Sequence, residues 1–172
     1  NDLRGIVNGL DYNEWNPETD AQIAKNFNVK NFRKEKVKNK LALQEELGLE
    51  VNPKTMMIGI VSRLTDQKGF DLISYMMDEM CQDSIQLVVL GTGDEKYENM
   101  FRHYAWKYDK KVSANIYYSE AMSHKVYASC DAFLMPSLFE PCGLSQLMSL
   151  RYGTVPIVRE TGGLKDTVEA YN

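Results

Sequence analysis

The stretch Pro136–Gly153 contains a carboxylate, Glu140, followed by the corner Pro141-Cys142-Gly143. An apolar run precedes this stretch, and a helical pattern ends it. The apolar run Ala132–Met135 indicates a strand, and the helical pattern starts at Leu144. Glu140 therefore falls between the carboxyl end of a strand and the amino end of a helix, where ligands bind in open α/β sheets. Gly143 permits close approach of the backbone to a ligand, and free N–H groups at the helix start can donate to hydroxyl or anionic groups. The same pattern also fits an ordinary strand–loop–helix joint with an exposed glutamate.

Two cations, Arg63 and Lys68, share one loop after the apolar run Met56–Val61. A planar arginine fork and a lysine point charge at the end of a strand can hold a pyrophosphate without a metal ion. By themselves they fit two solvated loop cations better than a pyrophosphate site. The following loop, Gly91–Asp94, contains a GxG pattern but lacks the third glycine of a dinucleotide fingerprint. We therefore interpret Gly91–Asp94 as a tight turn.

Two further loops carry candidate ligand-binding residues. Tyr118 follows the apolar run Val112–Tyr117, and an aromatic ring there fits either a stacking platform or the core. The tripeptide Thr161-Gly162-Gly163 follows the run Val155–Val158 and opens a helical pattern. Free N–H groups and the helix dipole at that point favour an anion, and a plain glycine turn is the alternative.

Composition describes an ordinary soluble domain. The chain has 172 residues, 44% hydrophobic and 26% charged, which is one domain by length with enough residues for a sizeable core. A net charge of −4 does not favour nucleic acid. No apolar run approaches the roughly 20 residues that span a bilayer, and no basic-then-apolar leader is present, so neither a membrane nor secretion is expected.

Cysteine and histidine usage points to reduced thiols and to no metal. Cys81, Cys130 and Cys142 are few, odd in number and widely spaced, which fits a cytoplasmic protein better than a disulfide framework. His103 and His124 have no cysteine or histidine partner at metal-ligand spacing. We therefore expect a cytoplasmic protein with no metal site.

Short apolar runs alternate with helical stretches beyond Pro53. The expected strands are Met56–Val61, Ile85–Leu90, Val112–Tyr117, Ala132–Met135 and Val155–Val158. The expected helices are Phe70–Met80, Glu95–Tyr108, Ala121–Cys130, Leu144–Tyr152 and one from Leu164 onward. This alternation predicts an α/β fold: a single Rossmann-like, doubly wound parallel sheet whose strands are covered on both faces.

The segment before these units is more polar. Residues 5–20 have the Gly, Asn, Asp and Pro content of a loop, and residues 31–49 show a charged amphipathic helix that Gly48 ends. Its expected apolar positions are Val37, Leu41 and Leu47. The basic run from residue 30 to 40 is interpreted as a solvated face, because acidic residues interrupt it and follow it.

Four ordered segments then carry a family resemblance. They are GIVNGLDYNEWNPETD, GIVSRLTDQKGFDLI, YYSEAMSHKVYASCDAFLMPS and SLFEPCGLSQLMSLRYGTVPIVRETGGLKDTV. Together they resemble bacterial glycogen synthases and plant starch synthases, which are retaining glucosyltransferases that use ADP-glucose. Those GT-B enzymes have two Rossmann-like domains facing across a cleft, and this chain is similar to the carboxyl-terminal one. The resemblance makes residues 1–30 an inter-domain linker and residues 31–172 the nucleotide-sugar-binding domain of a larger enzyme.

The resemblance implies roles for the loop residues. It places Glu140 beside the transferred glucose and makes Arg63 and Lys68 the groups that hold the diphosphate as it leaves. The remaining substrate contacts that it implies are adenine stacking by Tyr118, sugar contacts from the backbone of Cys142, Gly143 and Leu144, and diphosphate contacts from the turn Thr161, Gly162 and Gly163. Cys142 is not expected to be a nucleophile, because no His, Arg or Lys adjoins it in sequence to lower its pKa.

Two residues depart from patterns of related enzymes. Tyr117 stands where the family usually has glycine, so the local surface can differ. Met148 stands where many related retaining transferases have a second acidic residue, and starch and glycogen synthases also lack that acid. The second departure favours the narrower family.

The expected function is donor binding for transfer of glucose, with retention, from ADP-glucose to the 4-hydroxyl of an α-1,4-glucan. No cofactor or metal is expected, and the partners are the nucleotide sugar, the α-glucan and the amino-terminal domain of the same enzyme. The isolated chain should be a poor catalyst. The alternatives are a non-catalytic nucleotide- or glucan-binding module and a UDP-glucose-dependent retaining glycosyltransferase. A phosphorylase is disfavoured, because no segment matches the pyridoxal-phosphate lysine region of that family.

Overall fold

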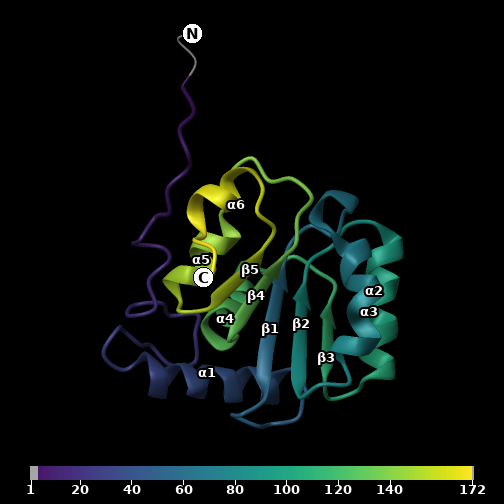
Figure 1. Ribbon diagram of the computed structural model, residues 1–172. Helices are drawn as coiled ribbons and strands as arrows, with labels where there is room; N and C mark the ends of the chain where they lie inside the picture. The colour runs from purple at the N-terminus through teal and green to yellow at the C-terminus, as the bar shows by residue number, and fades with distance from the viewer. Residues whose placement is uncertain (1–3, 172) are drawn as a thin grey trace.

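A parallel five-stranded sheet forms the centre of the computed structural model, which describes residues 4–171 (Figure 1). Its strand order is β3-β2-β1-β4-β5, so the first and fourth strands are neighbours. The strands are β1 (Met56–Val61), β2 (Ile85–Leu90), β3 (Val112–Asn115), β4 (Ala132–Met135) and β5 (Val155–Val158). The predicted fold class, a Rossmann-like parallel sheet, is confirmed.

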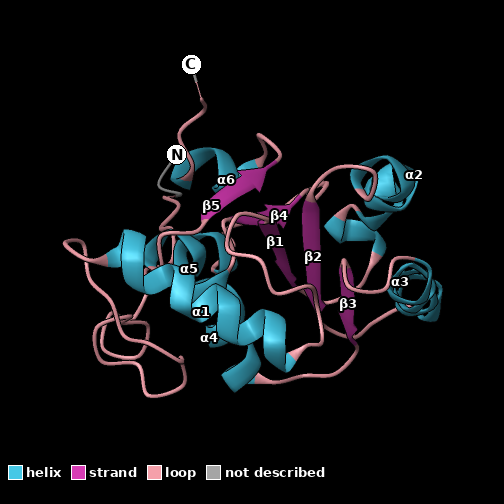
Figure 2. Ribbon diagram, turned by 90° about the horizontal axis from the view of Figure 1, so that it is seen from below, coloured by secondary structure: helices cyan, strands magenta, loops and turns pink. Residues whose placement is uncertain are grey.

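Helices connect the strands and cover both faces of the sheet. α2 and α3 lie on one face, and α1 and α4 lie on the other (Figure 2). The helices are α1 (Phe32–Glu46), α2 (Phe70–Met80), α3 (Glu95–Lys107), α4 (Glu120–Ser129), α5 (Ser145–Arg151) and α6 (Gly162–Thr167), with a 3-10 turn η1 (Asp66–Lys68) before α2. No helix within residues 4–171 is both long and apolar enough to cross a membrane.

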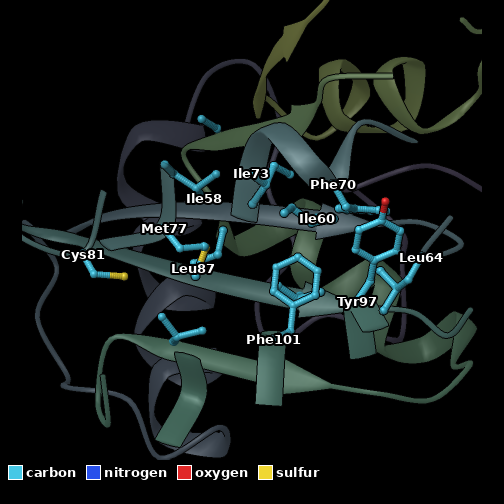
Figure 3. Close-up of a cluster of buried hydrophobic side chains, with 13 residues drawn as sticks. Ile58, Ile60, Leu64, Phe70, Ile73, Met77, Cys81, Leu87, Tyr97 and Phe101 are labelled. Atoms are coloured by element: carbon cyan, nitrogen blue, oxygen red, sulfur yellow. The ribbon is translucent and has the colours of Figure 1, made fainter. Parts of the chain in front are cut away.

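Alternate side chains of the central strands enter two different cores. Ile58 and Ile60 of β1 pack with Leu87 of β2 against α2 and α3, in the cluster drawn in Figure 3. Met57 of β1 packs with Val88 of β2 against α1 and α4. This period of two, with both faces apolar, explains why short continuous apolar runs form buried parallel strands.

A glycine in β1 lets α4 approach the sheet closely. A β-carbon on Gly59 would lie 2.7 Å from Cγ1 of Val126 and 2.9 Å from Sγ of Cys130. Both of those side chains are fully buried. The glycine therefore sets the spacing between the middle of the sheet and the helix that crosses it.

Residues 4–30, part of the predicted inter-domain linker and called the linker segment below, pack onto the rest of the chain over most of their length. The exposed start of this segment, from Arg4 to Val7, extends away from the body (Figure 1). Beyond it, Trp15, Ile23 and Phe27 are buried in a third cluster with side chains of α4 and β4. The linker segment is therefore part of the folded unit from about Leu10 onward.

The interpretation of the basic run as a solvated face is wrong for Lys36. Its buried ammonium lies within 3.1 Å of the carbonyl oxygens of Tyr127, Ala128 and Tyr152, and 2.8 Å from Oγ1 of Thr154. These carbonyls lie in the last turn of α4 and at the C-cap of α5, where helices leave acceptors unpaired and their dipoles are negative. Lys36 therefore caps two helix ends at once.

Lys40 is the second buried cation of α1. Its ammonium lies 2.6 Å from Oδ2 of Asp131 and 3.0 Å from the carbonyl oxygen of Thr55. The same Asp131 oxygen accepts the N–H of Met57, so this lysine joins the starts of β1 and β4. The inward face of α1 is therefore largely polar, consisting of Lys36, Asn39, Lys40, Leu43 and Gln44. The expected apolar positions Val37, Leu41 and Leu47 are only half-buried.

Several predicted boundaries also differ from the structure. The helix predicted over residues 31–49 spans Phe32–Glu46, and α3, α4 and α5 differ from their predicted ranges by one residue at one or both ends. β3 ends at Asn115 rather than Tyr117, because Asn115 is the last residue paired with β2. α6 begins at Gly162, two residues before the predicted Leu164, and ends at Thr167. The remaining strands have the predicted bounds.

Replacing Lys36 by methionine should destabilise the fold. Lys36→Met leaves buried carbonyl oxygens without a donor, which costs about 1–3 kcal/mol per unsatisfied group. Chemical denaturation should therefore show a lower free energy of unfolding than in wild type, whereas Lys34→Met on the exposed face of α1 should change it little. Equal stability of the two variants would contradict the capping role.

The burial of Lys36 also makes the difference in free energy of unfolding between wild type and Lys36→Met depend on pH. Desolvation lowers the pKa of Lys36 from 10.5 to about 8. Between these values the unfolded chain holds a proton that the folded chain has released, so the free energy of unfolding due to Lys36 rises with pH. The advantage of wild type over Lys36→Met should therefore increase from about pH 8 to pH 10.5. A constant difference would contradict the lowered pKa.

Candidate functional site

The carboxyl ends of β1 and β4 form a topological switch point. These two strands pair directly, but the chain leaves β1 toward β2 on one side and leaves β4 toward β5 on the other. The loops that follow them therefore diverge and leave a crevice, which is the usual ligand position in open parallel sheets. Both loops carry residues that the sequence singled out.

An ion pair joins the two loops across the crevice. Nζ of Lys68, at the end of η1, lies 2.6 Å from Oε2 of Glu140 in the loop after β4. Only 14% of the lysine side chain and 11% of the glutamate side chain are exposed. Oγ of Ser137 lies 3.3 Å from the same carboxylate oxygen and donates a second hydrogen bond. The structure thus brings together two of the three predicted catalytic residues.

Backbone contacts fix the lysine side of this pair. Gly69 has a φ of +78° and packs so closely on the backbone of Pro136 that a β-carbon would clash with it. The N–H of Leu138 donates to the carbonyl oxygen of Gln67 at 2.9 Å. Nε2 of Gln67 donates in turn to the carbonyl oxygen of Phe139 at 3.1 Å. The loops after β1 and β4 are therefore held together by main-chain contacts as well as by charge.

The glycine turn before and within α6 holds the glutamate side. Gly162, at a φ of +44°, lies against the backbone of Glu140, and the N–H of Gly163 donates to the Glu140 carbonyl oxygen at 2.9 Å. The N–H of Thr161 donates to the carbonyl oxygen of Arg159 at 2.9 Å. The prediction that this turn offers free N–H groups to an anion is therefore wrong for Thr161 and Gly163. Close packing, which only glycine permits, is the role that the contacts support.

The side chain of Gln146 fixes the backbone of the corner after Glu140. Gly143 has a φ of +72°, and Nε2 of Gln146 donates to the carbonyl oxygens of Cys142 at 3.0 Å and Gly143 at 3.1 Å. The N–H groups of Cys142, Gly143 and Leu144 donate to no acceptor within residues 4–171. These N–H groups remain available to a ligand.

A pocket of about 560 Å³ opens at the carboxyl ends of β1, β2 and β3, and neither Lys68 nor Glu140 lines it. Five segments line it: residues 9–15 of the linker segment, 61–63 after β1, 90–92 after β2, 117–120 after β3 and 144–148 at the start of α5, together with parts of α4. A smaller cavity of about 150 Å³ adjoins it and is lined by Lys68, Ser137 and Pro136, among others. Arg63 and Ser145 line both, so the two hollows form one connected site.

Arg63 and Tyr118 lie at this site with few internal contacts. Arg63 is exposed, and its guanidinium forms no ion pair in the described part of the chain. Lys68 is paired with Glu140, so Arg63 is the cation of this loop that has no ion-pair partner among residues 4–171, although Asp11, Glu14 and Glu120 also line the larger pocket. Tyr118 is 86% exposed and lines the larger pocket, so the core alternative for this ring is wrong.

The loop Gly91–Asp94 packs tightly under the Arg63 loop. The N–H of Leu64 donates to the carbonyl oxygen of Thr92 at 2.9 Å, and the N–H of Asp94 donates back to Leu64 at 2.7 Å. A β-carbon on Gly93 would clash with the backbone of Leu64. The prediction of a tight turn is wrong, because no hydrogen bond closes a turn within Gly91–Asp94. The loop instead pairs with Leu64 and supports the loop that carries Arg63.

The sequence analysis missed the wall that the linker segment contributes. Gly9, Leu10, Asp11, Glu14 and Trp15 all line the larger pocket. The available signal was the tryptophan, since a large apolar ring within a stretch of loop composition needs a buried place. Residues 4–171 contain no cluster of three or more His, Cys, Asp or Glu that could hold a metal ion. The expectation of a metal-free site stays a prediction.

A parallel sheet with a switch-point crevice, paired charges and connected pockets is typical of domains that bind nucleotide-linked substrates. The chain belongs to the glycosyl transferases group 1, whose family profile matches residues 44–172. The expected family is thereby confirmed.

Within that family, the chain matches glycogen synthases along its whole length. It is 74% identical to the glycogen synthase of Lachnospira eligens over 172 residues, which is 100% of this chain and 36% of that protein. It is 70% identical to the glycogen synthase of Lachnoclostridium phytofermentans over 170 residues, 99% of this chain and 36% of that protein. The chain thus spans about a third of the length of the curated relatives it matches.

The fold also matches a solved structure. The catalytic domain of starch synthase IV from Arabidopsis thaliana, bound to ADP and acarbose, superimposes with a TM-score of 0.89 at 38% identity. The match covers 96% of this chain and 34% of that chain. The predicted resemblance to glycogen and starch synthases is therefore confirmed.

The three thiols should differ in reactivity because only one of them is accessible. Burial raises the pKa of Cys81 and raises that of Cys130 to about 12, while Cys142 is half-buried and accepts a hydrogen bond from the N–H of Asn8. At about pH 8 a thiol reagent should modify one cysteine per folded chain, and the other two only after denaturation. A Cys142→Ser variant should show no fast-reacting thiol. Fast reaction of two or three thiols would contradict the packing around β1 and α4.

Proposed function

We propose that this chain is the donor-binding domain of an enzyme that transfers glucose from ADP-glucose to the 4-hydroxyl of an α-1,4-glucan, with retention of configuration. The observation that carries the proposal is the ion pair between Lys68 and Glu140 at the switch point, beside the connected pockets that Arg63 lines. The glycogen synthase relatives and the ADP-bound starch synthase support it.

The diphosphate is proposed to bind between the two cations of the loop after β1. Arg63 supplies an exposed guanidinium at the pocket, and Lys68 supplies an ammonium that Glu140 holds in place. As the bond to glucose breaks, negative charge grows on the departing ADP. Preorganised cations stabilise that charge at little reorganisation cost, because their positions are fixed before the reaction. No metal is required by this arrangement.

The glucose is proposed to lie against the loop after β4. The unpaired N–H groups of Cys142, Gly143 and Leu144 can donate to sugar hydroxyl groups, while the carboxylate of Glu140 can accept from them. The same carboxylate lies close enough to Lys68 to sense the charge of the leaving group. One residue thus serves both the sugar and the diphosphate.

The adenine is proposed to stack on Tyr118 at the rim of the larger pocket. A ring that is 86% exposed can offer a whole face to a base without moving core residues. The remainder of the enzyme, which this chain does not include, would bind the acceptor glucan and form the opposite wall of the cleft. The three proposed contacts lie on three separate loops of one sheet edge.

Donor choice tests the proposal. The enzyme that contains this chain should elongate glycogen from ADP-glucose faster than from UDP-glucose, and the new linkages should be α-1,4. Faster transfer from UDP-glucose would favour the alternative donor. Nucleotide binding without any glucosyl transfer would favour a non-catalytic module and overturn the proposal.

Arg63→Ala in that enzyme should lower kcat more than it raises the KM for ADP-glucose. The guanidinium forms no ion pair within residues 4–171, so its loss leaves no carboxylate unpaired there and acts on the leaving diphosphate. Loss of one such group typically lowers turnover by about a hundredfold or more. Arg102→Ala, on the exposed face of α3, is the matched control and should keep normal kinetics. Normal kinetics for both variants would remove Arg63 from the site.

A further inference from the structure

We propose that His124 is a positioning residue that holds Trp15 of the linker segment in place as a wall of the nucleotide pocket. Affinity for a nucleoside diphosphate then depends on His124, although this side chain is buried in the protein. The inference rests on the proposed function of the pocket. It is carried by a buried cluster of four side chains: Trp15, Asp20, His124 and Tyr152.

Trp15 lies flat on the imidazole of His124. The ring centroids are 4.1 Å apart, and the planes are inclined by only 13°. Tyr127 and Tyr152 complete the surroundings with edge contacts to the indole at centroid distances of 5.8 Å and 6.4 Å. The indole therefore has one rigid position, set by rings from α4 and from the end of α5.

A buried carboxylate fastens the imidazole to the linker segment. Oδ2 of Asp20 lies 2.6 Å from Nδ1 of His124 and accepts the hydroxyl of Tyr152 at 2.5 Å. The side chains of Asp20 and His124 are each 2% exposed. Removing one partner of a buried, hydrogen-bonded carboxylate is costly, so the linker segment is held where both donors can reach Asp20.

The second ring nitrogen of His124, Nε2, does not contribute to holding Trp15 or Asp20. Nε2 is buried and has no hydrogen-bond partner within residues 4–171. The two main contacts of the side chain are thus the 2.6 Å link from Nδ1 to Asp20 and the flat ring beneath Trp15, with a longer contact of 3.4 Å from Nδ1 to the Tyr152 hydroxyl. Asparagine can keep the first feature, and phenylalanine can keep the second. The two features are therefore separable by substitution.

The position of Trp15 sets the width of the pocket. Residues 9–15 of the linker segment form one wall, and Ser123 and Tyr127 of α4 also line the pocket. His124 lies between those two residues in sequence and carries Trp15 on its ring, so it fixes the linker wall relative to α4. A wall that is fixed before binding spares the ligand the cost of ordering it.

Nucleotide binding by the chain provides the test. Calorimetric titration with ADP should show about tenfold weaker binding, or more, for both His124→Asn and His124→Phe than for wild type. Trp15→Phe leaves the Asp20 pair intact but shrinks the wall, and it should also weaken binding. The matched controls are His103→Asn and His103→Phe at an exposed histidine of α3, which should bind ADP as wild type does.

A second readout does not depend on the nucleotide. The chain has two tryptophans, and the other one, Trp106, is 77% exposed. In a Trp106→Phe background, fluorescence reports Trp15 alone. The substitution His124→Asn should make Trp15 more accessible to acrylamide quenching while the circular dichroism remains that of a folded chain.

The outcomes separate the inference from the function on which it rests. Folded His124 variants that shield Trp15 and bind ADP as wild type does would overturn the positioning role. If the His124 variants do not fold, unchanged ADP affinity in Trp15→Phe would overturn it instead. Absence of ADP binding by wild type counts against the proposed donor site, and in that case the quenching of Trp15 in folded variants still decides whether His124 positions it.

Discussion

The direct pairing of β1 with β4 is the constraint on which the site depends. Because the chain leaves these neighbours in opposite directions, their following loops separate and expose their inner sides to a ligand. Lys68 and Glu140 then meet across the gap at 2.6 Å. Glycines at positions 69 and 162 let other backbone segments press against these loops, so the charged pair stands on a rigid base rather than on free loops.

The buried polar groups of the domain also make the surroundings of the site rigid. Lys36 and Lys40 are buried. They join helix ends and strand starts at the amino ends of the strands, opposite the site. The network of Asp20, His124 and Tyr152 fastens the linker segment to the pocket side. Each buried charge has hydrogen-bond partners, which is the condition for tolerating it, and each ties together segments distant in sequence. The proposed site, at which negative charge would grow on the leaving diphosphate, gains from such fixed surroundings.

The sequence predicted those features that depend on local pattern. Apolar runs predicted the bounds of β1 and β4, and the loops that follow these strands contain Arg63, Lys68 and Glu140. Features that depend on distant partners could not be predicted. The direction in which Lys36 points follows from the ends of two helices, 91 to 116 residues away along the chain. His124, the partner of Asp20, lies 104 residues along the chain. The N–H of Gly163 likewise looked free, because its acceptor, the carbonyl oxygen of Glu140, becomes a neighbour only when the loops fold together.

The central claim is that Lys68 and Glu140 act as one unit that serves both the diphosphate and the sugar. A double-mutant cycle on kcat for ADP-glucose, with Lys68→Met, Glu140→Gln and the double variant in the enzyme that contains this chain, measures it most directly. Contacting residues of one network are coupled, so the double variant should lose no more turnover than the worse single variant, with coupling of about tenfold or more. Losses that multiply, as for independent residues, would contradict the account.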